Sequence, residues 1–411
     1  MLDDIFKLSR NFLKTFNKPY RRYFLQKYPL ASRFSIITGQ RGIGKTTAMI
    51  QKTFSANAGD IFGKNALYVP VDHFIVAGRS LYEIAEEFYN LGGKMICFDE
   101  IHKYAGWSSE LKSIYDSLQK LTILASGSSA MEIQKGSHDL SRRAVVYPMT
   151  GLSFREYIDL AEGIKTESVV LKTILKEHEK LSYNIIAAIE TKKKKIIALF
   201  KDYLQFGYFP YFTEFDDISL YYITLEQSIR TTIESDLLSI YPALNGSSIK
   251  KIKKLLAVIA ESAPFIPDLK RLKRIVEIGD ERTLKNYLKY LEDGGVILSL
   301  TKSGSGLGAL EKPEKIYLNN PNQIYAISSE GKENIGTIRE TFFINMLSVM
   351  HKVSMPKKGD FYIDNKYTFE IEGKNKSFKQ IKDINNSFLA IDDIETGISN
   401  KIPLWLFGFL Y

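Results

Sequence analysis

The residues best suited to chemistry lie in one short stretch, Gly39-Gln40-Arg41-Gly42-Ile43-Gly44-Lys45-Thr46-Thr47. Glycines at three of these positions let the backbone wrap an anion and present unpaired N–H groups at the start of a helix, an arrangement that holds a triphosphate well. Lys45 would then reach the β- and γ-phosphates. Thr46 would place its hydroxyl on the Mg²⁺ ion that bridges those phosphates. The stretch therefore predicts a site for a nucleoside triphosphate.

A second motif supplies carboxylates for the same chemistry. Asp99 and Glu100 directly follow residues 94–98, a short apolar run typical of a buried parallel strand. Triphosphate hydrolysis needs one carboxylate on the magnesium side and one base for the attacking water. We expect Asp99 to take the first role and Glu100 the second.

Polar residues follow a third apolar run, residues 121–125. Ser126 and Ser128 would lie beside Glu100 and orient the attacking water, although serines at such a place also cap the following helix. Arg142 and Arg143 come next. Either could stabilise charge in the transition state, often across a subunit boundary, and either could equally serve as a cation near a helix C-terminus.

The elements that must position these residues alternate between strand and helix. Residues 34–37 form an apolar run that enters the glycine-rich loop, and an apolar helical pattern leaves it. The carboxyl ends of parallel strands meet at one edge of a sheet, so the loop, the carboxylates and the serines would converge there. The pattern predicts an α/β domain with a parallel sheet.

The motifs together resemble those of the prokaryotic AAA-type P-loop ATPases that carry a C-terminal restriction-endonuclease-like domain. The stretches that carry the resemblance are residues 38–47, 99–102 with Trp107, 126–129, 140–143 and 152–157. The resemblance implies an ATPase core over residues 1–150, a helical lid and junction over 151–245, a winged helix over 246–325 and a PD-(D/E)xK-like α/β domain over 326–411. It also implies adenine as the base of the nucleotide.

Length and composition agree with several domains and an ordinary globular protein. The chain has 411 residues, of which 45% are hydrophobic and 25% charged, and no apolar run approaches the twenty residues of a membrane span. The N-terminus lacks the features of a signal peptide, so we expect a cytoplasmic protein with no membrane partner. The single cysteine, Cys97, lies in a predicted strand and is expected to pack. The net charge of +9 favours an anionic partner.

Residues 249–318 read as three helices followed by two short strands around the Gly-Ser-rich turn 303–306, the order of a winged helix. In that arrangement Arg282, Lys285 and Lys289 would lie near the phosphates or bases of DNA. Winged helices also serve as protein-contact modules and as parts of ATPase lids. The sequence therefore predicts the segment and leaves its partner open.

The last part of the chain carries a second set of acidic residues. The set is a helical Glu340, an Asp360 at the start of a strand over 361–363, and Glu370, Glu372 and Lys374 on one side of a strand over 369–374, with Gln380 on a following helix. Acid, acid and acid-x-Lys is the arrangement that binds Mg²⁺ and activates water for phosphodiester cleavage. Such residues are also common on a solvated strand face, and Gly373 weakens the match.

Three functions follow from these motifs. The first is an oligomeric ATPase that binds and hydrolyses Mg-ATP and passes conformational work to DNA or to a protein. The second is a nucleotide-gated nuclease that acts through Asp360, Glu372 and Lys374. The third is a switch that uses ATP, without hydrolysing it, to set its assembly state or its binding to DNA.

Overall fold

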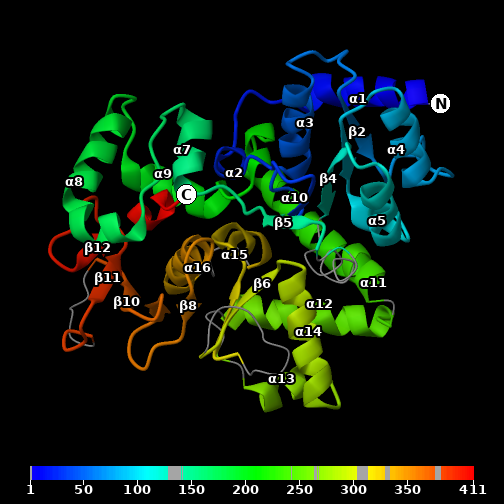
Figure 1. The fold of residues 1–411 in the computed structure, drawn as a ribbon. Coiled ribbons are helices and arrows are strands. Elements are labelled where there is room, and N and C mark those ends of the chain that lie inside the picture. Colours follow the sequence, from blue (N-terminus) through cyan, green and yellow to red (C-terminus); the bar gives the residue numbers. More distant parts are fainter. Residues whose placement is uncertain are drawn as a thin grey trace. The chain divides into compact units, whose positions relative to one another are not determined.

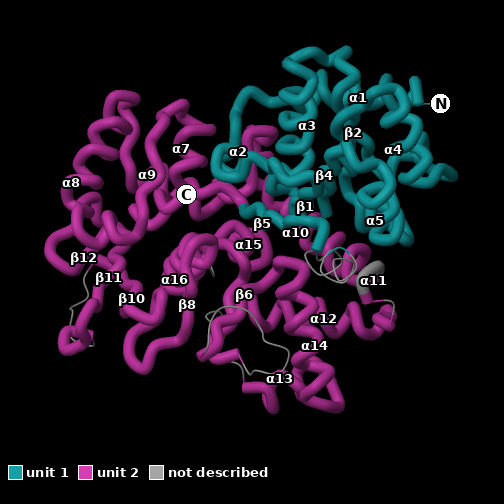
Figure 2. Tube along the Cα trace, viewed as in Figure 1, with its two compact units in different colours: residues 1–150 teal, residues 151–411 magenta. Residues whose placement is uncertain are grey.

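The computed structural model describes residues 2–127, 140, 142–241, 243–262, 266, 268–302, 313–328, 334–374 and 381–411. The chain divides into two compact units, Met1–Thr150 and Gly151–Tyr411 (Figure 2). In the described ranges no helix is both long and apolar enough to cross a bilayer.

The first unit is built on a five-stranded parallel sheet. Its strands are β1 (Phe34–Thr38), β2 (Ala66–Pro70), β3 (Met95–Asp99), β4 (Thr122–Gly127) and β5 (Val145–Pro148), in the order β2-β3-β4-β1-β5. Figure 1 labels β2, β4 and β5 of this sheet. The three strands predicted from the apolar runs are thus confirmed. Because β4 lies between β1 and β3, the residues that end β4 lie between the glycine-rich loop and the carboxylates.

Helices cover both faces of this sheet. They are α1 (Leu2–Phe16), α2 (Tyr23–Lys27), α3 (Lys45–Ala56), α4 (Leu81–Asn90) and α5 (Trp107–Ser117), with a 3-10 turn at Ile101–Lys103. Alternate strand residues such as Ile96 and Phe98 face the core that α4 and α5 help to form. Cys97 points the other way, toward α3, where its sulfur accepts a hydrogen bond from Thr53 at 3.2 Å. The expected packing role of this cysteine is confirmed by its complete burial.

The second unit begins with helices. They are α7 (Phe154–Glu162), α8 (Leu171–Glu190), α9 (Ile196–Phe206), α10 (Ile218–Thr231) and α11 (Leu237–Ile240), with a 3-10 turn at Pro210–Glu214 and a π-helical turn at Thr232–Asp236. Helix α7 starts with a reciprocal capping box between Ser153 and Glu156, and it ends at Gly163 in the left-handed conformation.

Three helices and a hairpin follow in the order that the sequence predicts. They are α12 (Gly246–Ser262), α13 (Leu269–Val276), α14 (Glu281–Asp293) and the antiparallel strands β6 (Ile297–Leu300) and β7 (Lys315–Leu318). Asp268 and Asp280 cap the starts of α13 and α14 by accepting hydrogen bonds from backbone N–H groups. The turn at 303–306 lies outside the described residues. That this segment acts as a winged helix stays a prediction.

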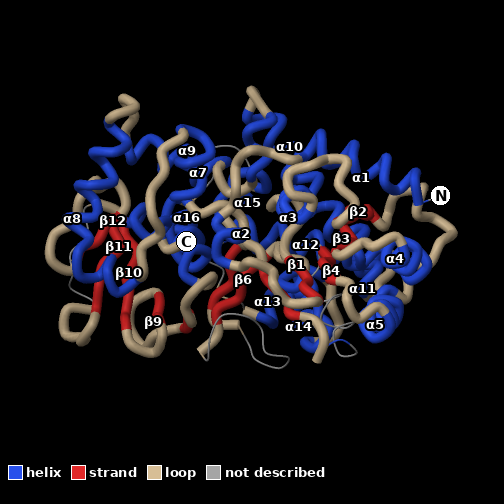
Figure 3. Tube along the Cα trace, turned by 45° about the horizontal axis from the view of Figure 1, so that its top comes forward, coloured by secondary structure: helices blue, strands red, loops and turns tan. Residues whose placement is uncertain are grey.

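The chain ends in a mixed α/β segment. Its elements are α15 (Pro321–Ile327), α16 (Ile335–Leu347), β8 (Val353–Ser354), β9 (Phe361–Ile363), β10 (Tyr367–Glu372), β11 (Ser387–Ile391), β12 (Lys401–Pro403) and a 3-10 helix at Leu404–Phe409. The strand order is β12-β11-β10-β9-β8, parallel from β10 to β12 and antiparallel from β8 to β10 (Figure 3).

Two details of this segment differ from the sequence-based prediction. Strand β10 ends at Glu372, so the predicted strand over 369–374 is too long and Lys374 lies beyond it. Glycine at 373 has no side chain to pack on the sheet, which explains why the strand stops there. Residue 380 lies outside the described residues, and Ile381 lies in a turn and not on a helix.

Candidate nucleotide-binding site

The glycine-rich loop takes backbone conformations that other residues rarely adopt. Gly39 has φ 150°, and a Cβ atom there would lie 2.3 Å from the carbonyl oxygen of Met149. Gly44, with φ 97°, is the residue before α3, and no side chain caps the N-terminus of that helix. The first turn of α3 therefore presents N–H groups and a positive helix end, which suits a phosphate.

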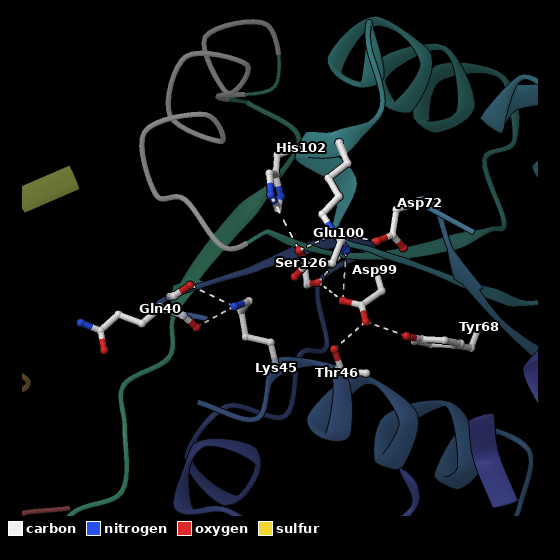
Figure 4. A network of polar contacts seen from close by, with 11 residues as sticks. Gln40, Lys45, Thr46, Tyr68, Asp72, Asp99, Glu100, His102 and Ser126 are labelled. Atoms are coloured by element: carbon white, nitrogen blue, oxygen red, sulfur yellow. Dashed lines mark hydrogen bonds and ion pairs between the residues drawn. The ribbon is translucent and has the colours of Figure 1, made fainter. Parts of the chain in front are cut away.

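Lys45 bends back over the loop in this structure. Its Nζ atom donates hydrogen bonds to the carbonyl oxygens of Gly39 at 3.0 Å and Gln40 at 2.8 Å (Figure 4). The side chain is buried. A buried ammonium held by carbonyl oxygens at the mouth of the loop is placed to exchange these partners for the stronger charge of a phosphate.

The other loop residues are placed as follows. Ile43 is buried, Gly42 is exposed, and Gln40, Arg41 and Thr47 are partly buried. Arg22, which precedes α2, donates from its guanidinium to the carbonyl oxygens of Ile43 at 2.8 Å and Thr150 at 3.0 Å. Arg22 is itself buried, and its hydrogen bond to Ile43 helps to hold the glycine-rich loop in place.

Asp99 is the centre of a buried hydrogen-bond network. Its Oδ2 atom accepts a hydrogen bond from the Thr46 hydroxyl at 2.7 Å and another from the Tyr68 hydroxyl at 2.6 Å. Its Oδ1 atom accepts one from the Ser126 hydroxyl. Figure 4 shows the three hydroxyls converging on this carboxylate from α3, β2 and β4. Thus Thr46 and Asp99, which are far apart in the sequence, offer hard oxygen atoms at one place.

The backbone at Glu100 is strained, and its side chain lies near Lys103 and His102. Glu100 has φ 55°, which is uncommon for a residue other than glycine, and its N–H donates to Ser126 Oγ at 3.2 Å. Its Oε2 atom lies 3.6 Å from Lys103 Nζ and 3.8 Å from His102 Nε2. The side chain is only 21% exposed. Glu100 therefore lies in a strained turn directly after the end of β3.

Lys103 also pairs with Asp72, at 2.6 Å. Burial opposes the charge of Lys103, but the hydrogen bond to Asp72 and the nearby Glu100 outweigh it, and the pKa of Lys103 is raised. The lysine therefore stays protonated and keeps a positive charge beside the carboxylate of Glu100.

The donor set fits Mg²⁺ bound with a phosphate. Mg²⁺ takes oxygen ligands and is commonly held by only one or two protein groups, with water and phosphate oxygens supplying the rest. Thr46 and Asp99 provide two such oxygens. No group of three or more Asp, Glu, His or Cys side chains that could hold a metal ion occurs in the described ranges.

The other predicted residues of the first unit are Arg142, Arg143 and Ser128. Arg143 forms a two-point ion pair with Asp116 of α5, at 2.9 and 3.0 Å, on the surface of the first unit. Arg142 is exposed and makes no ion pair with any described residue. Ser128 lies outside the described residues.

Tyr68 was not predicted from the sequence, although its hydroxyl touches Asp99. It lies in a strand whose residues are all buried, so nothing in the pattern separates it from the apolar core. Burial and the charge of Asp99 hold its pKa well above the ordinary value of a tyrosine. Tyr68 is therefore a neutral hydrogen-bond donor that orients the carboxylate.

Replacing Tyr68 by Phe is expected to raise the Mg²⁺ concentration needed for half-maximal nucleotide hydrolysis by about 10-fold, because Asp99 loses one of its orienting donors. The aromatic contact with Phe12, 5.2 Å between ring centroids, is retained. Activity is to be measured against Mg²⁺ at saturating ATP. Tyr89→Phe, at a partly buried tyrosine packed on the core of the same unit, is the matched control. Equal Mg²⁺ curves for both variants would contradict this role.

Two stretches of the chain are similar to known families. Residues 31–158 match the family described as "AAA domain". This stretch is similar to AAA-type P-loop domains. The match spans the loop, both carboxylates and the strand of Ser126. A second family, described only as a domain of unknown function, matches residues 197–330, which include the helices from α10 to α15 and the hairpin β6–β7.

Individual proteins similar to this chain add little about its role. An uncharacterized protein of Methanocaldococcus jannaschii is 31% identical over 209 residues, which cover 47% of this chain. This chain spans 42% of the length of that relative. Among solved structures, a Walker-type ATPase of Pyrococcus abyssi is 11% identical with a TM-score of 0.38, covering 74% of this chain and 93% of its own. AMPPCP-bound DnaA from Aquifex aeolicus is 14% identical with a TM-score of 0.25, covering 70% and 86%. Scores this low carry no argument about function.

Proposed function

We propose that the chain binds and hydrolyses Mg-ATP in its AAA domain. The observation that carries the proposal is the contact between Thr46 and Asp99, with Glu100 in a strained turn next to them. A phosphate loop alone would support binding. A carboxylate placed beyond the magnesium-side pair supports turnover, because hydrolysis also needs a base for water.

Each residue then has a distinct role. The loop N–H groups and Lys45 hold the phosphates, and Lys45 exchanges its two carbonyl partners for phosphate oxygens. Thr46 and Asp99 hold Mg²⁺, with Tyr68 and Ser126 fixing the orientation of Asp99. Bound Mg²⁺ offsets the charge on the β- and γ-phosphates.

Glu100 acts as the general base. It takes a proton from a water molecule as the water oxygen bonds to the γ-phosphorus and the bond to the β–γ bridging oxygen breaks, releasing ADP. The ammonium of Lys103 lies 3.6 Å from the Glu100 carboxylate. Ser126 accepts a hydrogen bond from the backbone N–H of Glu100 and so helps to fix the position of the Glu100 backbone.

Assembly into an oligomer would complete the site. A transition state for phosphoryl transfer gains from an arginine that reaches the γ-phosphate, in cis or from a neighbour. Arg143 is engaged with Asp116, whereas Arg142 is exposed and makes no ion pair with a described residue, so Arg142 is the residue we assign to a neighbouring copy's nucleotide. In a closed ring each copy would give and receive one such arginine.

Steady-state phosphate release by the purified chain tests the proposal. We expect turnover with Mg-ATP, and loss of turnover when EDTA removes the metal. The same assay with double-stranded DNA asks whether that partner stimulates hydrolysis. Absence of turnover with Mg-ATP, with and without DNA, would contradict the proposed ATPase activity and favour the nucleotide-dependent switch.

The distribution of charge favours DNA as the partner, and we assign its contact to α13. The cations predicted to face DNA on α14 are largely neutralised, because Lys285 pairs with Glu281 at 3.0 Å and Lys289 with Asp293 at 2.8 Å. Helix α13 instead carries four cations in two turns, and none forms an ion pair with a described residue. They are Lys270, Arg271, Lys273 and Arg274.

Replacing Lys270 and Arg274 together by Ala is expected to weaken binding to double-stranded DNA and to lower the slope of log affinity against log salt by about 2, because each cation neutralises about one phosphate. Fluorescence anisotropy over a range of salt concentrations measures both. Lys285→Ala combined with Lys289→Ala is the matched control and should change the slope less. A larger change in the control would return the contact to α14.

A further inference from the structure

A lysine ammonium lies between the two acidic side chains predicted to begin a second metal site. Lys315, the first residue of β7, has its Nζ atom 3.0 Å from Glu340 Oε2 and 3.4 Å from Asp360 Oδ1. The three side chains are 11%, 14% and 22% exposed. The ring of Phe361 also faces this ammonium, 6.0 Å from its centroid. The cluster is therefore largely removed from water and already contains a cation.

The carboxylate oxygens of the cluster have further donors. Glu340 Oε2 accepts a second hydrogen bond from the buried Tyr317 hydroxyl at 2.7 Å. Asp360 Oδ2 accepts one from the backbone N–H of Ile371 at 2.8 Å. Both oxygens of Asp360 and the inner oxygen of Glu340 thus have protein donors. A divalent ion would have to displace the ammonium and compete with these hydrogen bonds.

The rest of the predicted acidic set does not complete a metal site. Glu370 is buried within β10, and Lys374 lies beyond the end of that strand. Arg339 brings a second cation, since its guanidinium lies 2.9 Å from where a Cβ of Gly373 would be, and it pairs with Asp392 at 2.7 Å. Among the residues that the structure describes, which leave out 329–333 and 375–380 of this segment, no three Asp, Glu, His or Cys side chains form a group able to hold a metal.

We infer that Lys315 is the resident cation of this cluster and that Glu340 and Asp360 hold it in place of a divalent metal. The three residues come from the hairpin, from α16 and from the position directly before β9. The cluster therefore ties the three-helix-and-hairpin segment to the C-terminal sheet. It does not support metal-dependent phosphodiester cleavage. The inference does not depend on ATP hydrolysis, because all its residues lie in the second unit.

Metal binding by the full chain tests the inference directly. The protein carries Asp99→Asn, which removes the proposed metal ligand of the first unit. Mn²⁺ is titrated into this protein, and the concentration of free Mn²⁺ is measured by electron paramagnetic resonance. We expect Asp360→Asn, added to that background, to leave Mn²⁺ binding unchanged. One saturable Mn²⁺ per chain that disappears with Asp360→Asn would overturn the inference.

The thermal stability of Lys315 variants tests whether Lys315 is the cation that the two carboxylates require. Lys315→Met is expected to lower Tm by about 10 °C, because it leaves two carboxylates in a largely buried site without their cation. Adding Glu340→Gln should recover part of this loss. Lys302→Met is the control, since that lysine is 83% exposed. A Lys315→Met protein with the same Tm as the control would contradict the role of Lys315 as the resident cation. If Lys315→Met does not fold, the Mn²⁺ titration still tests the inference.

Discussion

Glu100→Gln is expected to lower kcat for ATP hydrolysis by about 10²- to 10⁴-fold while leaving nucleotide affinity nearly unchanged. Glutamine keeps the shape of the side chain but cannot accept the proton of the attacking water. In the proposed site the loop and Lys45 would hold the phosphates and Thr46 the Mg²⁺, so the Glu100 carboxylate is not among the groups that would hold the nucleotide. Steady-state phosphate release gives kcat, and a fluorescent ATP analogue gives affinity.

The control for this variant is Glu86→Gln, an exposed glutamate of α4 in the same unit. Its kcat should equal that of the unaltered protein. Hydrolysis by Glu100→Gln at the same rate as the control would remove Glu100 as the base. A loss of affinity equal to the loss of kcat would show instead that the carboxylate serves binding.

Lys45→Ala is expected to weaken ATP binding by about 100-fold, which removes measurable hydrolysis at ordinary nucleotide concentrations. The ammonium is buried in the loop and its present partners are neutral carbonyls, so the phosphate charge is its best partner. Isothermal titration with a non-hydrolysable ATP analogue and Mg²⁺ measures the loss.

Lys52→Ala is the matched control, because Lys52 belongs to the same helix and donates to the Pro29 carbonyl on the surface. We expect its affinity for nucleotide to match that of the unaltered chain. An equal loss in both variants would trace the effect to the folding of α3 and not to the phosphate contact. Wild-type affinity in Lys45→Ala would place the nucleotide elsewhere.

Much of the first unit could be predicted because its candidate site residues lie next to its strands. The loop follows β1 and the two carboxylates close β3 or follow it, so an apolar run and the polar residues after it predict both fold and site. Arg22 and Tyr68 could not be found in this way. Each reaches the site through tertiary contacts, and Tyr68 lies in a strand with no exposed position.

The C-terminal segment was predicted less well, because its key contact joins distant positions. Lys315 meets Glu340 and Asp360 across 25 and 45 residues, and no spacing in the sequence relates a hairpin lysine to those acids. The predicted strand extends past Gly373 to Lys374, although glycine weakens a strand and was a local reason to end the strand before it.

The basic residues of α14 show a signal that the sequence did contain. Glu281 and Lys285 are four residues apart, as are Lys289 and Asp293, and this spacing places opposite charges side by side on a helix. Both pairs form in the structure. Helix α13 has no acidic residue within its eight positions, so its four cations face no such neighbour on their own helix.

The central claim is that Thr46, Asp99 and Glu100 form a hydrolytic site and not only a binding site. Its most direct test is a single turnover, in which excess protein is mixed with Mg-ATP labelled at the γ-phosphate and the products are separated after quenching in acid. We predict that the unaltered chain converts its bound ATP to ADP and phosphate, whereas Glu100→Gln retains bound ATP uncleaved. Equal conversion by both proteins, or bound ATP left intact by both, would contradict the account.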